Sequence, residues 1–169
     1  IPVPMSTPSF VDAFSQQFTL DPAHTALLII DMQNATGNRH MGLGKLLAEQ
    51  GNSDSAQYRF DRIDDLLIPN IQKLIAGFRA AGASIIWITY GANAQDASDA
   101  PPHIAPIIKA TNNIAGQPEH EVVDALKPGP NDLVLNKTTQ GAFRSTGLDS
   151  ALRALGVTTV VSTGVSTNN

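Results

Sequence analysis

Three short apolar segments of this chain end in groups that could carry out chemistry. A carboxylic acid, Asp31, follows one segment, an amine, Lys137, ends another, and Thr163-Gly164 ends a third. In a sheet of parallel strands such ends emerge at one edge, where ligands bind and reactions take place. A carboxylate and an ammonium that meet there favour each other's charged forms. A plain ion pair and a catalytic pair are equally compatible with these residues alone.

The segments that must position these groups have the length and composition of buried strands. Each is short, continuous, apolar and rich in β-branched residues. Four strands are expected, over residues 25–31, 84–90, 132–137 and 157–163. Apolar residues at helical spacing lie between them, over 63–78 and 145–155, with a shorter stretch over 119–126. This alternation predicts an α/β fold in which a parallel sheet carries helices on both faces.

Two other regions have no such regular pattern. Residues 35–60 contain Gly, Asn and Ser without clean periodicity, although their leucines could support one helical turn. A connection of this length is typical of a lid, a binding loop or a subunit contact. Pro69, inside a helical pattern, indicates a kink or a new helix start. Residues 1–22, with four prolines, are expected to form an N-terminal arm with a short helical stretch.

Composition limits the classes of partner. The 169 residues suit one domain, and the net charge of −4 disfavours nucleic acid and anionic membranes as partners. No apolar run is long enough to span a bilayer and no export leader is recognisable, so a cytoplasmic location is the default expectation. The chain has no cysteine, which excludes disulfides within it.

Several motifs, taken in order, resemble the isochorismatase-like cysteine hydrolases. Asp31-Met32-Gln33-Asn34 follows the first strand, Lys137 precedes Gly141-Ala142-Phe143, and Gly164-Val165-Ser166-Thr167-Asn168 follows the last strand. Each motif is weak alone, but their order and spacing over residues 25–169 are together fairly specific. The superfamily includes nicotinamidases, N-carbamoylsarcosine amidohydrolase and ureidoacrylate amidohydrolase.

The resemblance has several implications for the whole domain. It implies a Rossmann-like three-layer sandwich over residues 23–169, incomplete at the C-terminus because the last strand lacks a covering helix. It also implies a hydrolase that acts on the C–N bond of a small amide or ureido compound without a cofactor. Relatives of this kind commonly assemble as homodimers or homotetramers, so a homo-oligomer is expected.

The resemblance also assigns a catalytic triad. Its acid is Asp31, its lysine is Lys137, and its nucleophilic cysteine falls immediately after Asn169. Truncation, a chemically modified cysteine at that position or a different residue there would each explain the lack of cysteine, and the second is favoured. Asp31 would take the thiol proton, Lys137 would stabilise the thiolate, and backbone N–H groups including that of Ser166 would stabilise the oxyanion. The resemblance further implies a cis bond between Val165 and Ser166.

Five more residues are candidates for substrate binding: Gln33, Asn34, Tyr90, Phe143 and Arg144. Arg144 could clamp a substrate carboxylate in bidentate fashion, or be a solvated arginine at a helix start. For Gln33 and Asn34, holding the first turn by ordinary hydrogen bonds is favoured over facing a substrate. Packing is the favoured role for the aromatic residues, Trp87 included. Nicotinamidases carry a metal-binding Asp-x-His group after the second strand, whereas this chain has Tyr90-Gly91-Ala92-Asn93, so no metal is expected.

Three other interpretations stay open. Residues 164–168 resemble a Gly-x-Ser-x-Gly elbow with Ser166 as nucleophile, but the final glycine and a downstream acid and histidine are lacking. Isochorismatase-type relatives hydrolyse vinyl ethers without a cysteine, and the residue after Asn169 would distinguish them. A non-catalytic binding domain on the same sheet would leave Asp31 and Lys137 apart, without a pocket between them.

Overall fold

The computed structural model describes Phe14 and residues 19–166. Most of the predicted N-terminal arm, with its helical stretch, lies outside the described residues, as do the last three residues of the expected nucleophile turn, 167–169. Within the described part, a 3₁₀ turn, η2 (Pro22–His24), leads into the first strand. None of the helices there has both the length and the apolar character needed to cross a membrane.

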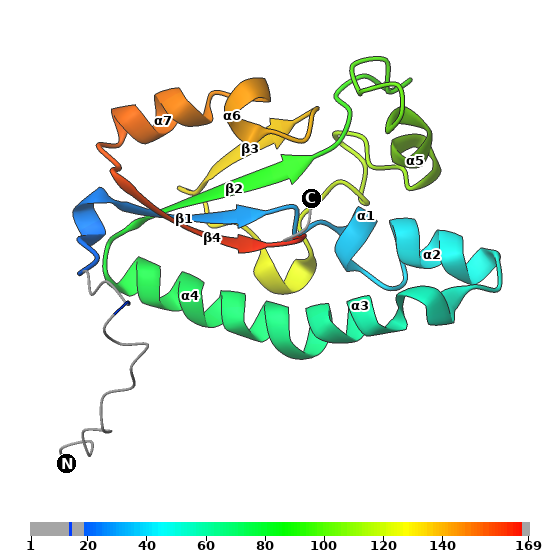
Figure 1. The fold of residues 1–169 in the computed structure, drawn as a ribbon, viewed down its shortest axis with the longest axis horizontal. Coiled ribbons are helices and arrows are strands. Elements are labelled where there is room, and N and C mark those ends of the chain that lie inside the picture. The colour runs from blue at the N-terminus through cyan, green and yellow to red at the C-terminus, as the bar shows by residue number, and fades with distance from the viewer. Residues whose placement is uncertain (1–13, 15–18, 167–169) are drawn as a thin grey trace, which may run out of the picture.

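Four parallel strands form the sheet (Figure 1). They are β1 (Thr25–Ile30), β2 (Ser84–Tyr90), β3 (Leu133–Lys137) and β4 (Thr159–Gly164), and their order across the sheet is β3-β2-β1-β4. The central strands, β1 and β2, are buried along nearly their whole length, which explains their continuous apolar sequences. The four strands predicted from the sequence are confirmed.

Helices cover both faces of the sheet (Figure 1). One face carries a long helical run made of α3 (Gln57–Arg62), the π-helical segment η4 (Ile63–Leu67) and α4 (Ile68–Ala80). The other face carries α6 (Ala142–Ser145) and α7 (Leu148–Ala154). The helical run continues through Pro69, which lies in the first turn of α4 directly after the π-helical segment, so the proline coincides with a change in the helical hydrogen-bond pattern rather than with a separate helix.

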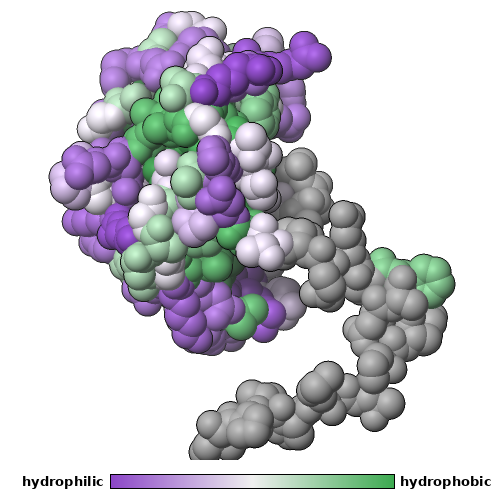
Figure 2. All heavy atoms as spheres, turned by 90° about the vertical axis from the view of Figure 1, so that its left-hand side faces the viewer, coloured by the Kyte–Doolittle hydropathy of each residue, from purple (hydrophilic) through white to green (hydrophobic). Residues whose placement is uncertain are grey.

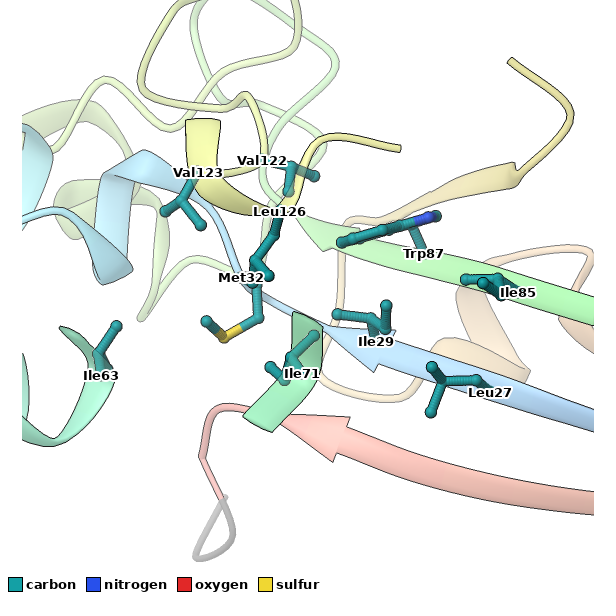
Figure 3. Packing of buried hydrophobic residues seen from close by; sticks show 10 residues of the cluster. All are labelled: Leu27, Ile29, Met32, Ile63, Ile71, Ile85, Trp87, Val122, Val123 and Leu126. Carbon is teal, nitrogen blue, oxygen red and sulfur yellow. The ribbon is translucent and has the colours of Figure 1, made fainter. Parts of the chain in front are cut away.

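Alternate side chains of the central strands enter two separate cores. Figure 3 shows Leu27, Ile29 and Trp87 on the side of Ile71 from α4. The intervening residues pack with α7 on the opposite face; this second cluster comprises Ala26, Leu28, Ile86, Ile88, Leu148 and Leu152. Burial on both faces fixes the direction of every strand side chain and therefore fixes which residues emerge at the strand ends.

Residues 35–60 form more helix than the single turn that their leucines indicate. The segment contains α1 (Asn34–Gly37), α2 (Gly42–Glu49) and a 3₁₀ turn, η3 (Ser53–Ala56), before α3 begins. Two glycines near the start of α2 lower its helix propensity and hide it in the sequence. Close packing explains both glycines, because a Cβ on Gly42 would lie 2.4 Å from the carbonyl oxygen of Ala35 and one on Gly44 would lie 2.2 Å from that of Arg39.

The helix predicted over 119–126 is reduced to a single 3₁₀ turn, η5 (Asp124–Leu126). The backbone before it is used elsewhere: the carbonyls of Glu119 and Glu121 accept hydrogen bonds from the N–H groups of Ala35 and Asn34. A helix would use those carbonyls internally, so the interaction with α1 prevails. The helix predicted over 145–155 is shorter too, since Gly147 separates α6 from α7. One further helix, α5 (Ala105–Ala110), follows β2.

Candidate active site

The acid after β1 and the amine of β3 meet at one edge of the sheet, as predicted. Lys137 Nζ donates to Asp31 Oδ2 at 2.8 Å, and the two side chains are 6% and 21% exposed. Because β2 lies between β1 and β3, the lysine must reach across the end of β2. Its ammonium lies 4.2 Å from the centroid of the Tyr90 ring, a favourable cation–π distance. The pair is therefore a buried one, supported by an aromatic face.

The electrostatics of Asp31 differ from the sequence-based expectation. Burial raises the pKa of Asp31, and this effect outweighs the charge and hydrogen bond of Lys137, which act in the opposite direction. The expected net shift toward the charged form is therefore wrong for this carboxyl. A raised pKa brings a carboxylic acid closer to the range in which it can both accept and release a proton.

One oxygen of Asp31 remains available for chemistry. Oδ1 is buried and has no hydrogen-bond partner among the described residues, whereas Oδ2 is bound to Lys137. Buried polar atoms normally have a partner, so an unsatisfied carboxylate oxygen at a strand end indicates a place for an incoming donor. The backbone of Asp31 is left-handed, with φ of 55°, a conformation that Asp tolerates better than most residues and that is frequent at functional sites.

The turn after β4 lies directly beside Asp31. The N–H of Val165 donates to the carbonyl of Ile30 at 3.1 Å, and the Val165–Ser166 peptide bond is cis, as the sequence resemblance implies. Gly164 makes this approach possible: its φ is 122°, and a Cβ there would lie 2.0 Å from the carbonyl oxygen of Ile30. Val165 and Ser166 thus join Asp31 and Lys137 at the same edge.

Gln33 and Asn34 are occupied within the protein rather than facing a substrate. Gln33, 1% exposed, accepts from the N–H of Tyr90 at 2.7 Å and donates to the carbonyls of Tyr90 and His120. Asn34 donates to the carbonyl of Pro118 at 3.0 Å. Both side chains hold the segments that frame the site, which is the role by ordinary hydrogen bonds that the sequence favours for them.

The aromatic candidates and Arg144 differ in how deeply they are buried. Trp87 is buried in the core as expected, and the hydroxyl of Tyr90 is buried without a partner among the described residues. Burial, followed by the charge of Asp31, raises the pKa of Tyr90, so its hydroxyl stays neutral. Phe143 was expected to pack but is 58% exposed, because α6 packs against the core through Ala142. Arg144 is exposed as well.

Sequence reasoning missed one residue at this edge, Arg59 of α3. Its guanidinium donates to the carbonyl of Thr36 and to the hydroxyl of Ser166. Burial lowers the pKa of this half-buried arginine. Nothing in the local sequence distinguishes it from a surface arginine, because only the tertiary fold brings α3 to the turn after β4.

No metal site is recognisable in the described part of the chain, where no three or more His, Cys, Asp or Glu side chains are grouped suitably. His120 is buried beside Asn113 and Gln33, and burial lowers its pKa. An apolar hollow of about 250 Å³ lies between α4 and the start of β1. The hollow lies at the opposite end of β1 from Asp31. Figure 2 shows this side of the molecule, where hydrophobic residues lie between hydrophilic ones.

The chain is similar to known proteins over most of its length. The isochorismatase domain family model matches residues 25–169. The chain is 32% identical to ureidoacrylate amidohydrolase RutB of Enterobacter sp. (strain 638), over 90% of this chain and 68% of the relative. It is 34% identical to the RutB of Methylobacterium radiotolerans, over 90% of this chain and 60% of that protein.

Two solved structures are also similar to this chain. A cysteine hydrolase from Pseudomonas syringae pv. phaseolicola is 26% identical with a TM-score of 0.67, covering 90% of this chain and 64% of that protein. N-carbamoylsarcosine amidase from Thermoplasma acidophilum is 25% identical with a TM-score of 0.58, covering 83% of this chain and 66% of that one. The chain thus spans about two thirds of the length of these relatives.

Proposed function

This chain belongs to the isochorismatase family, and we propose that it is an amidohydrolase that cleaves the C–N bond of a small amide or ureido compound. The proposal rests on one observation above all: the buried Asp31–Lys137 pair, 2.8 Å apart, at the edge where the Val165–Ser166 turn emerges. The names of the relatives, ureidoacrylate amidohydrolase and N-carbamoylsarcosine amidase, support this class of substrate.

The proposed nucleophile is a cysteine at the position that follows Asn169 in the family motif. Asp31 accepts the thiol proton through Oδ1, the carboxylate oxygen that has no hydrogen-bond partner among the described residues. Lys137 holds Asp31 through Oδ2 and stabilises the thiolate, which is the attacking form. The thiolate adds to the substrate carbonyl and forms a tetrahedral oxyanion.

The turn after β4 would stabilise that oxyanion. The N–H of Ser166 and the N–H of the nucleophile are the proposed donors, and such a donor contributes about 3–4 kcal/mol. Collapse of the intermediate breaks the C–N bond, and Asp31 gives its proton to the departing ammonia or amine. Water then attacks the thioester, with Asp31 as base, and regenerates the thiol.

Two alternative functions make different predictions. A non-catalytic binding domain predicts that the acid and the lysine lie apart, so the 2.8 Å ion pair favours the catalytic alternative. Vinyl-ether hydrolysis needs no sulfur nucleophile, so the presence of a reactive thiol distinguishes it from C–N cleavage.

Alkylation of the full-length protein tests the proposal. We expect iodoacetamide to abolish ammonia release from ureido compounds, with peptide mapping showing one modified cysteine directly after Asn169 and with substrate slowing the modification. An Asp31→Asn variant should react more slowly, because the thiol loses its base. Full activity after alkylation would refute the cysteine mechanism and favour vinyl-ether chemistry.

A further inference from the structure

Arg59 joins the two segments that bear the proposed catalytic groups. Its Nη1 lies 3.4 Å from Ser166 Oγ, and its Nε and Nη2 lie 3.3 and 3.2 Å from the carbonyl oxygen of Thr36. The hydroxyl of Thr36 in turn donates to the carbonyl of Asp31 at 3.4 Å. The guanidinium is therefore at the rim of the site, next to the turn after β4.

These contacts use the hydrogen-bonding capacity of the guanidinium only weakly. All the acceptors are neutral, and distances of 3.2–3.4 Å are long for N–H···O hydrogen bonds. A guanidinium has five N–H donors in a planar fork that matches a carboxylate. Arg59 can thus hold its position and still bind an anion.

The charge of Arg59 is also uncompensated in the described part of the chain. Two of the acids on the same helical run, Asp61 and Asp64, bind Arg39 at 3.0 and 2.6 Å, and no described carboxylate lies within ion-pair distance of Arg59. At the same rim, Lys137 is already neutralised by Asp31. A half-buried cation without a counter-ion is costly unless an anion arrives to pair with it.

We propose that Arg59 binds a carboxylate of the substrate, so that the enzyme selects anionic ureido or amide compounds such as N-carbamoyl amino acids. This inference rests on the proposed C–N hydrolysis and adds the residue that recognises the carboxylate of the substrate. Arg144, the arginine expected for this role from the sequence, is exposed, whereas Arg59 contacts the turn after β4.

A pair of substrates that differ in the carboxylate tests the proposal. N-carbamoylglycine carries the anion, and N-propylurea has a similar length without it; both release ammonia from the same carbamoyl group. We expect Arg59→Gln in the full-length protein to lower kcat/KM for N-carbamoylglycine about 10- to 100-fold and to leave that for N-propylurea within about twofold. Arg59→Lys should recover part of the loss, because it restores the charge without the fork.

The matched control is Arg62→Gln, at an exposed arginine of the same helix. It should leave the ratio of the two kcat/KM values unchanged. Equal losses on both substrates in Arg59→Gln would show a merely structural role, and a wild-type enzyme without preference for the anion would show that Arg59 pairs with something other than substrate. Either result overturns the inference.

Binding separates this inference from the proposed function. If the wild-type protein releases ammonia from neither compound, calorimetric titration with N-carbamoylglycine still reports on Arg59. Binding to wild type and Arg62→Gln that is lost in Arg59→Gln would support the carboxylate site while C–N hydrolysis fails. Absent or equal binding in all three proteins would refute the site as well.

Discussion

Replacing Lys137 by methionine removes the ammonium of the buried pair and keeps a side chain of similar length. Asp31 would then remain at the strand end without its cation. Removing one partner of a buried ion pair costs about 3–5 kcal/mol, and the 21% exposure of Asp31 places the expected loss near the lower end, about 3 kcal/mol near neutral pH.

Protonation of Asp31 should limit that loss of stability, because an uncharged carboxyl no longer needs the ammonium as its partner. Burial already raises the pKa of Asp31 and Lys137 opposes it, so the variant raises this pKa further. A carboxyl with a raised folded-state pKa stabilises the fold fully below its unfolded pKa, and this contribution disappears as the pH rises through the folded pKa. The stability gap between variant and wild type should therefore narrow as the pH is lowered from about 7.5 to about 5.

Urea unfolding at both pH values measures the gap, and ammonia release measures activity, which we expect to fall at least about 10³-fold. Lys127→Met is the control, since Lys127 and Asp124 lie 2.9 Å apart but are 70% and 87% exposed; its cost should be at most about 1 kcal/mol. A Lys137→Met protein with near-normal turnover, or with a stability loss independent of pH, would refute the reasoning.

Two further substitutions test the frame of the site. Gln33→Leu removes the partner of the N–H of Tyr90 and of two backbone carbonyls, those of Tyr90 and His120. The free energy of unfolding should therefore fall by about 3 kcal/mol in a denaturant titration, and a loss below about 1 kcal/mol would contradict this hydrogen-bond network. Gly164→Ala places a Cβ 2.0 Å from the carbonyl oxygen of Ile30 and should abolish activity. The control is Gly82→Ala, where φ is 71° but the surrounding space is open; it should lower the free energy of unfolding by only about 1–2 kcal/mol and leave turnover intact. Equal effects of the two substitutions would argue against a steric requirement at Gly164.

The position of the acid–lysine pair follows from the sequence because buried parallel strands have an unmistakable pattern. Once the strands ending near Asp31 and Lys137 are identified, parallel topology alone places their ends at one edge. The balance of forces on Asp31 does not follow, since burial depends on how Tyr90 and Lys137 cover it. Proximity is a property of topology, whereas desolvation is a property of packing.

The features that the sequence did not reveal are those in which tertiary contacts prevail over local preference. α2 contains glycines that lower its propensity but that its packing requires. The segment before η5 gives its carbonyls to α1 instead of to a helix of its own. Arg59 is a further example, because only the folded chain brings it to Ser166, which is 107 positions away in the sequence.

The strand order has a consequence for how activity develops during folding. Asp31 and Lys137 come from strands separated by β2, so their contact depends on two successive ladders, β1 with β2 and β2 with β3. A slip of one residue in either ladder would displace one group by about 3.3 Å, more than the ion pair tolerates. Regain of enzymatic activity after denaturation should therefore report docking of β3 in its correct register, and it cannot precede that step.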